Sequence, residues 1–261
     1  MKVLVTIACA ALTALCTLAS AKPIHPWVVD SPKLSPAAFF TNIKDGDSVS
    51  SPFVVRFGMN EWGLAPADYD LPKTGHHHLL INTDLPVPID APIAFSDNYR
   101  HFGKGQMETV LNLKKGKHTL RLLLANHLHV PHMVYSKQLT INVVDQTNRP
   151  LPVGYSTEPS VELLNPIDGQ AVGGVFQVQF HASNYNIAHK TTALKGTGHF
   201  VLSIETNQNR TETIVYSGGE TETWIKLPAG VSSAKFRLDI IDNVTKKPLK
   251  LVSKAVSVSV R

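Results

Sequence analysis

Beyond residue 21 the chain contains no cysteine. The two cysteines of the 261-residue sequence, Cys9 and Cys16, both lie before that point. The rest of the chain therefore has no disulfide to brace it and no thiolate to act as a nucleophile or a metal ligand. Any metal site must use histidine, carboxylate, methionine or water, and the hydrophobic core alone must stabilise the fold.

Long apolar runs are also scarce, and the one that stands out is Val3 to Leu18. Lys2 provides the positive start of a signal peptide, and Ala19-Ser20-Ala21 provides a small-x-small cleavage pattern. We therefore predict a cleaved signal peptide at residues 1–21 and a mature chain that starts at Lys22 and has no membrane span. The predicted location is secreted, meaning extracellular, or periplasmic in a Gram-negative bacterium.

Dense charge runs and known catalytic motifs are missing too. The formal net charge is +5, but the basic residues are scattered or lie in turns such as "KKGK" at 114–117. This pattern argues against a nucleic-acid partner. The sequence has no Ser-His-Asp signature, no glycine-rich phosphate loop and no His-Glu-x-x-His helix. A function other than catalysis is favoured, and the question of an enzyme stays open.

An internal duplication organises what is present. "NIKDGDSVSSPFVVRF" from Asn42 matches "NPIDGQAVGGVFQVQF" from Asn165 at an offset of 123 residues. The same offset carries Trp62 onto Tyr185, and Thr74-Gly75-His76 onto Thr197-Gly198-His199. Later, "LRLLLAN" at 120–126 pairs with "FRLDIID" at 236–242. The chain is a tandem repeat of a unit of roughly 110 residues.

Each unit has the pattern of an all-β domain. Short apolar runs alternate with turn residues, and no long stripe of 3.6-residue period appears. We predict two tandem immunoglobulin-like antiparallel β-sandwich domains. Their expected limits are an N-terminal extension at 22–37, a histidine-rich sandwich at 38–144, a proline-rich linker at 145–160 and a degenerate repeat at 161–261. Strands are expected near 38–42, 53–58, 77–82, 107–113, 118–125 and 136–144, and near 161–164, 175–181, 199–206, 211–216, 222–227, 234–241 and 250–260.

The two units differ most in histidine. "TGHHHLLINTD" at 74–84 corresponds to "TGHFVLSIETN" at 197–207, so His77 and His78 are matched by Phe200 and Val201. His76 is matched by His199, and both a structural role and a ligand role stay open for it. A second cluster in the first unit, "ANHLHVPHMV", corresponds to "IDNVTKKPL", which has no histidine. Both clusters are lost together, as the parts of one shared site would be.

Strand geometry brings the two clusters together. In such a sandwich the third strand pairs antiparallel with the sixth, and alternate side chains share a face. His77 then points inward, whereas the two histidines on either side of it point outward towards the second cluster. Several neutral imidazoles suit copper or zinc. We predict a divalent metal site among His76, His78, His127, His129, His132, His101 and His77. A metal-free polar cluster and a cluster that binds another ligand are the alternatives.

Several quoted stretches resemble one known family. "TGHHHLLINTD", "APIAFSDNYRHFGKGQMETVLNLKKGKHTLRLLLANHLHVPH" and "SKQLTINV" are similar to the exported, bacterial-type domains grouped as domain of unknown function 4399. The resemblance covers residues 38 to 144. It implies a small β domain with a histidine-rich end, and it implies no established activity. The second unit departs from it because it has no histidine at the positions that match His77, His78 and the three histidines of the second cluster.

These observations predict a secreted, histidine-rich metal-binding protein for sequestration, delivery or sensing. A cell-surface or wall-associated module that recognises a polysaccharide or a partner protein is the first alternative, and a metalloenzyme is the second. Leu80 and Leu123 fall on the outward face of the first unit, which suggests a docking surface there. His181 and His189 are expected at the surface or in loops.

Overall fold

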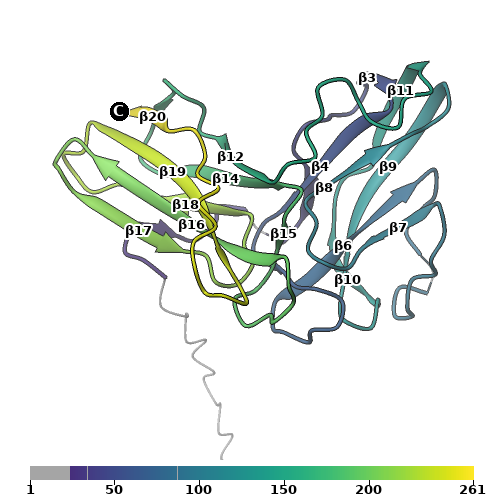
Figure 1. The fold of residues 1–261 in the computed structure, drawn as a ribbon, viewed down its shortest axis with the longest axis horizontal. Helices are drawn as coiled ribbons and strands as arrows, with labels where there is room; N and C mark the ends of the chain where they lie inside the picture. Colours follow the sequence, from purple (N-terminus) through teal and green to yellow (C-terminus); the bar gives the residue numbers. More distant parts are fainter. Residues whose placement is uncertain (1–23, 34, 87) are drawn as a thin grey trace, which may run out of the picture.

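The computed structural model describes residues 24–33, 35–86 and 88–261, and the predicted signal peptide lies outside this range. The described residues form β-strands and connecting turns, with no helix among them. They build two β-sandwiches that diverge from a shared junction (Figure 1). Within this part of the chain there is no helix long and apolar enough to cross a membrane. The predicted all-β fold with two tandem sandwiches is confirmed.

The first sandwich packs a three-stranded sheet against a seven-stranded one. Its core lies between the sheets and includes Phe57, Leu79 and Leu122. The small sheet has the order β2 (Ala38–Phe40), β4 (Phe53–Met59), β8 (Glu108–Leu111). The large sheet runs β3 (Ser48–Ser51), β11 (Leu139–Gln146), β9 (Gly116–Ala125), β6 (Thr74–Ile81), β5 (Gly63–Leu64), with β7 (Tyr99–Phe102) also on β6 and β10 (Pro131–Tyr135) also on β9.

The second sandwich repeats this plan with sheets of four and six strands. Phe180, Phe200 and Phe236 lie at its centre. One sheet has the order β1 (Val28–Val29), β18 (Glu222–Ile225), β14 (Phe176–Ser183), β12 (Ser160–Asn165). The other runs β13 (Ala171–Val172), β20 (Val256–Val260), β19 (Ser233–Asp242), β16 (Thr197–Thr206), β15 (Asn186–Ile187), with β17 (Thr211–Val215) also on β16.

The N-terminal segment belongs to the second sandwich, although it precedes the first in sequence. Val28 pairs with Ile225, and Trp27 is buried in the core of the second unit. His25 Nε2 lies 3.2 Å from Glu212 Oε2. The chain therefore contributes a strand to the second sandwich before it builds β2 of the first.

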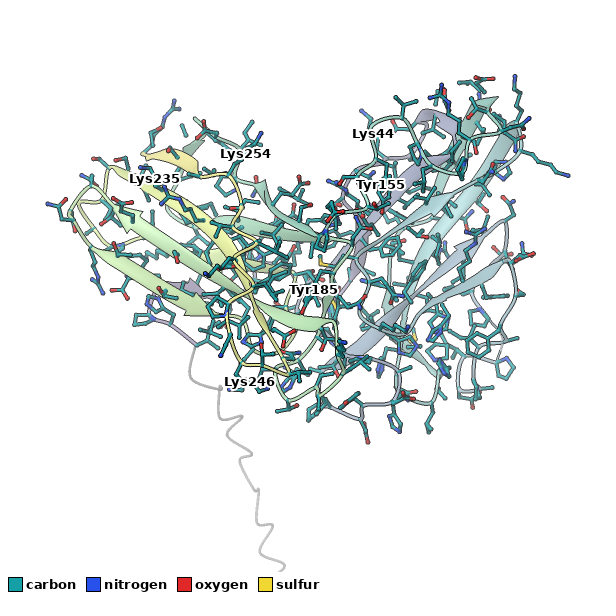
Figure 2. The ribbon with its side chains drawn as sticks, in the orientation of Figure 1. Lys44, Tyr155, Tyr185, Lys235, Lys246 and Lys254 are labelled. Carbon is teal, nitrogen blue, oxygen red and sulfur yellow. The ribbon has the colours of Figure 1, made fainter. Side chains whose placement is uncertain are left out.

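The two sandwiches meet through direct backbone contacts. The amide of Leu64 donates to the carbonyl of Gly219 at 2.8 Å, and its carbonyl accepts from the amide of His189 at 2.9 Å. A Cβ atom at Gly63 would lie 1.9 Å from the carbonyl oxygen of Gly218, so the approach requires glycine there. Side chains such as Tyr155 and Tyr185 fill the region between the ribbons (Figure 2).

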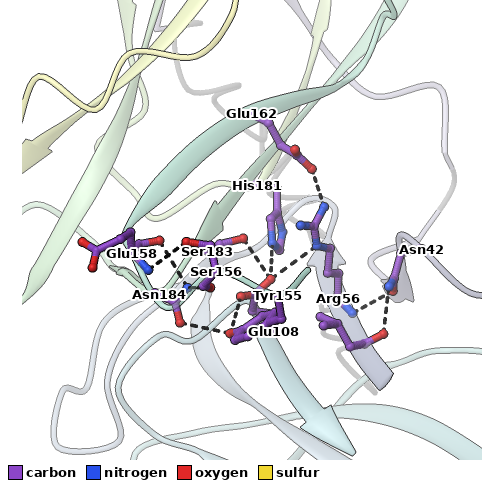
Figure 3. Close-up of polar contacts among 11 residues, drawn as sticks. Asn42, Arg56, Glu108, Tyr155, Ser156, Glu158, Glu162, His181, Ser183 and Asn184 are labelled. Carbon is purple, nitrogen blue, oxygen red and sulfur yellow. Dashed lines mark hydrogen bonds and ion pairs between the residues drawn. The ribbon is translucent and has the colours of Figure 1, made fainter. Parts of the chain in front are cut away.

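A polar cluster closes the same junction (Figure 3). Glu108 Oε2, on β8 of the first unit, accepts hydrogen bonds from His181 Nε2 at 3.0 Å and Ser183 Oγ at 2.9 Å, both on β14 of the second. Arg56 Nε lies 3.3 Å from the same oxygen. The prediction of His181 as a surface residue was wrong: its side chain is completely buried, because the junction covers the strand face that carries it.

Candidate metal centre

β6 presents its histidines to two different environments. Cross-strand partners share a face, and His76 stands opposite Ala125 while His78 stands opposite Leu123 on β9. These positions form the outer face of the large sheet. His77 alternates to the inner face, where its ring packs edge-on against Phe57 with centroids 5.4 Å apart. The predicted inward and outward directions therefore agree with the structure.

The outer face is nevertheless covered. Ile93 and Leu85, from the loop between β6 and β7, pack on Leu80 and Leu123, and both of these leucines are 0% exposed. The amide of Ile93 donates to the carbonyl of His129 at 2.9 Å, which fixes the loop to the turn after β9. The proposed docking surface at Leu80 and Leu123 is therefore wrong. On the same face His76 and His78 are only 0% and 1% exposed.

A short strand that the sequence did not indicate brings His101 into the group. β7 pairs antiparallel with β6, and His101 stands directly opposite His78 on the outer face. The sequence predicted His101 as a ligand but placed no strand around it. Gly103 leaves room for the ring, since a Cβ atom there would lie 2.2 Å from Cε1 of His101.

The turn after β9 positions His129. The side-chain oxygen of Asn126 accepts hydrogen bonds from the amides of Leu128 at 2.9 Å and Val130 at 3.0 Å. His129 adopts a left-handed backbone with φ of 62°, a conformation in which histidine is more frequent than most residues. Its ring turns back over β6, edge-on to the ring of His76 at 5.0 Å between centroids.

Four imidazoles converge as a result. Nε2 of His76 lies 3.0 Å from Nε2 of His78 and 3.1 Å from Nδ1 of His129. One nitrogen from each of four rings lies within 4.8 Å of the others: His76, His78, His101 and His129. A tetrahedral zinc ion with bonds of 2.0–2.1 Å separates its nitrogen ligands by about 3.3 Å. The two shortest separations are already close to that value, so the donor set fits a copper or zinc ion.

The cluster resists protonation. Burial, followed by repulsion from His78 and the other neighbouring histidines, lowers the pKa of His76 to about 2. Burial is also the main cause that lowers the pKa of His78 to about 3. The pKa of His101 is lowered by burial and by His129, against the opposing effect of Asp68. The lowered pKa values of His76, His78 and His101 favour the neutral ring, which is the form that binds metal.

Ring contacts, together with the close approach of Nε2 of His76 to Nε2 of His78, position the two innermost rings. Nδ1 of His76 and of His78 is buried without a partner, and so is Nε2 of His101. Phe95 lies edge-on to His101 and His129, with centroids 5.2 and 5.1 Å away. Because buried polar atoms normally have partners, Nε2 of His101 is an atom of the group whose missing partner a bound ion could supply.

The other three predicted ligands lie apart from this group. His127 Nδ1 lies 3.3 Å from Oδ1 of Asp70. The ring of His132 packs against Trp62 at 4.4 Å between centroids. His77 lies in the core on the opposite face of β6.

The second unit lacks the four-histidine group at the matched positions. Val201 and Val215 pair across β16 and β17, as His78 and His101 pair across β6 and β7. His199 remains, but its Nδ1 lies 2.7 Å from Oδ1 of the buried Asn243. His199, the histidine of the group that the second unit retains, therefore makes a hydrogen bond to an amide instead of meeting other imidazoles.

Comparison with known proteins supports the sequence-based recognition. The chain matches the family described as "Domain of unknown function (DUF4399)" over residues 55–144 and again over 178–261. These two matches cover more than half of the chain, and the protein belongs to this family in both of its units. No curated protein matches the chain.

The solved structures that the chain matches have very different sequences. The fibronectin(III)-like modules of Clostridium thermocellum CbhA share 10% identity, with 85% of this chain and 92% of theirs covered and a TM-score of 0.27. The chicken interferon gamma receptor alpha chain shares 8% identity, with 86% and 97% covered and a TM-score of 0.29. Dimeric latent PorU from Porphyromonas gingivalis shares 12% identity, with 86% of this chain and 20% of PorU covered and a TM-score of 0.31.

Proposed function

We propose that this member of the DUF4399 family is exported and binds one copper or zinc ion for sequestration, delivery or sensing outside the cytoplasm. The observation that carries the proposal is the convergence of four ring nitrogens within 4.8 Å. The ligands are His76, His78, His101 and His129. The protein's own contribution is to crowd these rings together and to shield His76 and His78 from water.

The donor count favours binding over catalysis. Structural zinc sites have four protein ligands, whereas catalytic sites keep a position for water or substrate. Four imidazoles complete the first kind of shell. Because none of the four ligands is charged, a bound ion would keep its full positive charge. The carboxylate of Asp68, whose charge acts on His101, would offset part of that charge.

The test is a metal titration of residues 22–261, purified without a histidine tag, against a competing chelator. The decisive variant is His78→Val, because the matched strand of the second unit carries Val201 at that position. The control is His118→Ala. His118 lies away from the cluster, and its ring contacts Asn82 at 3.0 Å and the carbonyl of Lys114 at 2.8 Å.

We expect one zinc or copper ion per chain in the parent and in the control. In His78→Val the affinity should fall by more than the roughly 10- to 100-fold that loss of an outer hydrogen-bond partner costs. Equal and weak affinity in all three proteins would remove the metal proposal. The binding module for a polysaccharide or partner protein would then be the leading hypothesis.

A further inference from the structure

A cavity of about 740 Å³ opens at an edge of the first sandwich, and none of the clustered histidines lines it. It lies between β2 of the small sheet and the segment 135–139, which joins β10 to β11 at the edge of the large sheet. Its volume lies within the roughly 300–1,000 Å³ typical of small-molecule pockets.

The walls of this cavity are mainly apolar and aromatic. Phe39 and Phe40 come from β2, Ile43 follows that strand, and Leu139 begins β11. Tyr135, at the end of β10, adds a further ring. Phe39 rests on Gly58, where a Cβ atom would lie 2.5 Å from the ring. The hydrocarbon part of a ligand could therefore pack against a substantial apolar surface in this cavity.

The charges around this apolar surface are mostly positive. Lys44 (labelled in Figure 2), Arg121 and Lys137 line the cavity, and in the described part of the chain none of them has a carboxylate within 4.0 Å. Lys33 also lines it, but its Nζ binds Glu222 Oε1 at 3.1 Å. The one acidic lining residue, Asp45, already accepts the amide of Thr140 at 2.7 Å.

Arg121 is the most informative of these residues. Its Nε is shielded from solvent and has no hydrogen-bond partner among the described residues. Buried donors normally find an acceptor, and a charged donor without one is costly. The second unit offers the contrast: Arg237, at the matched position, is 47% exposed and lies 4.0 Å from Glu205.

We propose that this cavity binds a small amphiphilic anion, namely a free medium-chain carboxylate. Its hydrocarbon body lies against Phe39, Phe40 and Leu139, and its carboxylate accepts from Arg121. Lys44 and Lys137 add attraction from the rim. This site is separate from the metal centre and does not depend on it.

The experiment uses the full mature chain in the presence of EDTA, with decanoate as the probe in isothermal titration calorimetry. Decyltrimethylammonium, which has the same chain length and the opposite charge, tests the charge requirement. The variants are Arg121→Gln and Lys137→Gln, and the matched control is Arg237→Gln. Circular dichroism of each variant checks that the fold is retained, and Lys137, an exposed residue, can be replaced without disturbing the core.

We expect one decanoate per chain and no comparable binding of the cation. Arg121→Gln should raise the dissociation constant about tenfold or more, which corresponds to about 1.4 kcal/mol. Lys137→Gln should raise it less, and Arg237→Gln should leave it unchanged. Equal binding of both probes, an equal effect of Arg121→Gln and Arg237→Gln, or no decanoate binding at millimolar concentration would overturn the proposal. His78→Val should bind decanoate normally, which separates this result from the metal test.

Discussion

Nε2 of His76 lies 3.0 Å from Nε2 of His78, two residues along the same buried strand. Alternation along β6 places both rings on one face, and both are buried. The rings are therefore neutral, adjacent and removed from water before any ion arrives.

Metal should stabilise the protein. Binding to the folded state alone raises the free energy of unfolding by about 4 kcal/mol when free metal is 1,000 times its dissociation constant. Urea denaturation with and without zinc, and after EDTA treatment, measures this increase. His78→Val serves as the control and should show a much smaller increase at the same metal concentration. An identical response of parent and variant would mean that the ion binds elsewhere.

Replacing His77 by Phe should reduce acid sensitivity. Burial lowers the pKa of His77 to about 3, from an ordinary value of 6.5. Between pH 6.5 and pH 3 the His77 ring is therefore protonated in the unfolded chain but neutral in the folded protein. The free energy of unfolding falls as the pH falls through this range. This one residue contributes about 1.4 kcal/mol for each pH unit in that window.

Phe200 occupies the matched position in the second unit, so the strand accepts the aromatic ring. Denaturation of His77→Phe in EDTA between pH 7.5 and pH 5 should show a shallower dependence of stability on pH. Its metal affinity should equal that of the parent, because His77 faces away from the cluster. An unchanged pH dependence would contradict the assignment of His77 as a neutral core residue.

Gly103→Ala should weaken metal binding without unfolding the domain. The added methyl group would lie 2.2 Å from Cε1 of His101, so the ring must leave its present position. We expect the dissociation constant to rise by about tenfold or more, on the scale of changes that disturb ligand orientation. Gly173→Ala is the control, because a Cβ atom there meets nothing within 4 Å. Unchanged affinity in Gly103→Ala would show that His101 is not a ligand.

Glu108→Gln should destabilise the contact between the sandwiches. Burial by itself would raise the pKa of Glu108, but hydrogen bonds from His181, Ser183 and Tyr155 outweigh it, and the pKa lies below its ordinary value. The carboxylate is thus charged and surrounded by donors. Removing one partner of a buried charged pair costs about 3 kcal/mol or more.

Glu162→Gln is the matched control for this prediction. Glu162 pairs with the same Arg56, but its side chain is 48% exposed, against 6% for Glu108. An exposed pair contributes under about 1 kcal/mol. Chemical denaturation that gives similar losses for both variants would contradict the central role of Glu108 in the junction.

The sequence by itself determined the repeat, the all-β class and the faces of the main strands. Alternation is a local property of extended backbone, so "HHHLLI" places His76 and His78 on one side and His77 on the other without any knowledge of the rest of the fold. Antiparallel pairing of β6 with β9 then follows from the order of strands in a sandwich, and it directs the turn that carries His129 towards the same end.

Only the tertiary structure decided which histidines meet and what covers them. β7 has four residues and too little periodicity to be recognised, yet its register sets His101 opposite His78. Contacts between distant segments also decide three other features. They place the loop over Leu80 and Leu123, pair the N-terminal strand with the second sandwich, and bury His181. Such contacts have no period in the sequence, because they depend on which surfaces the folded chain brings together.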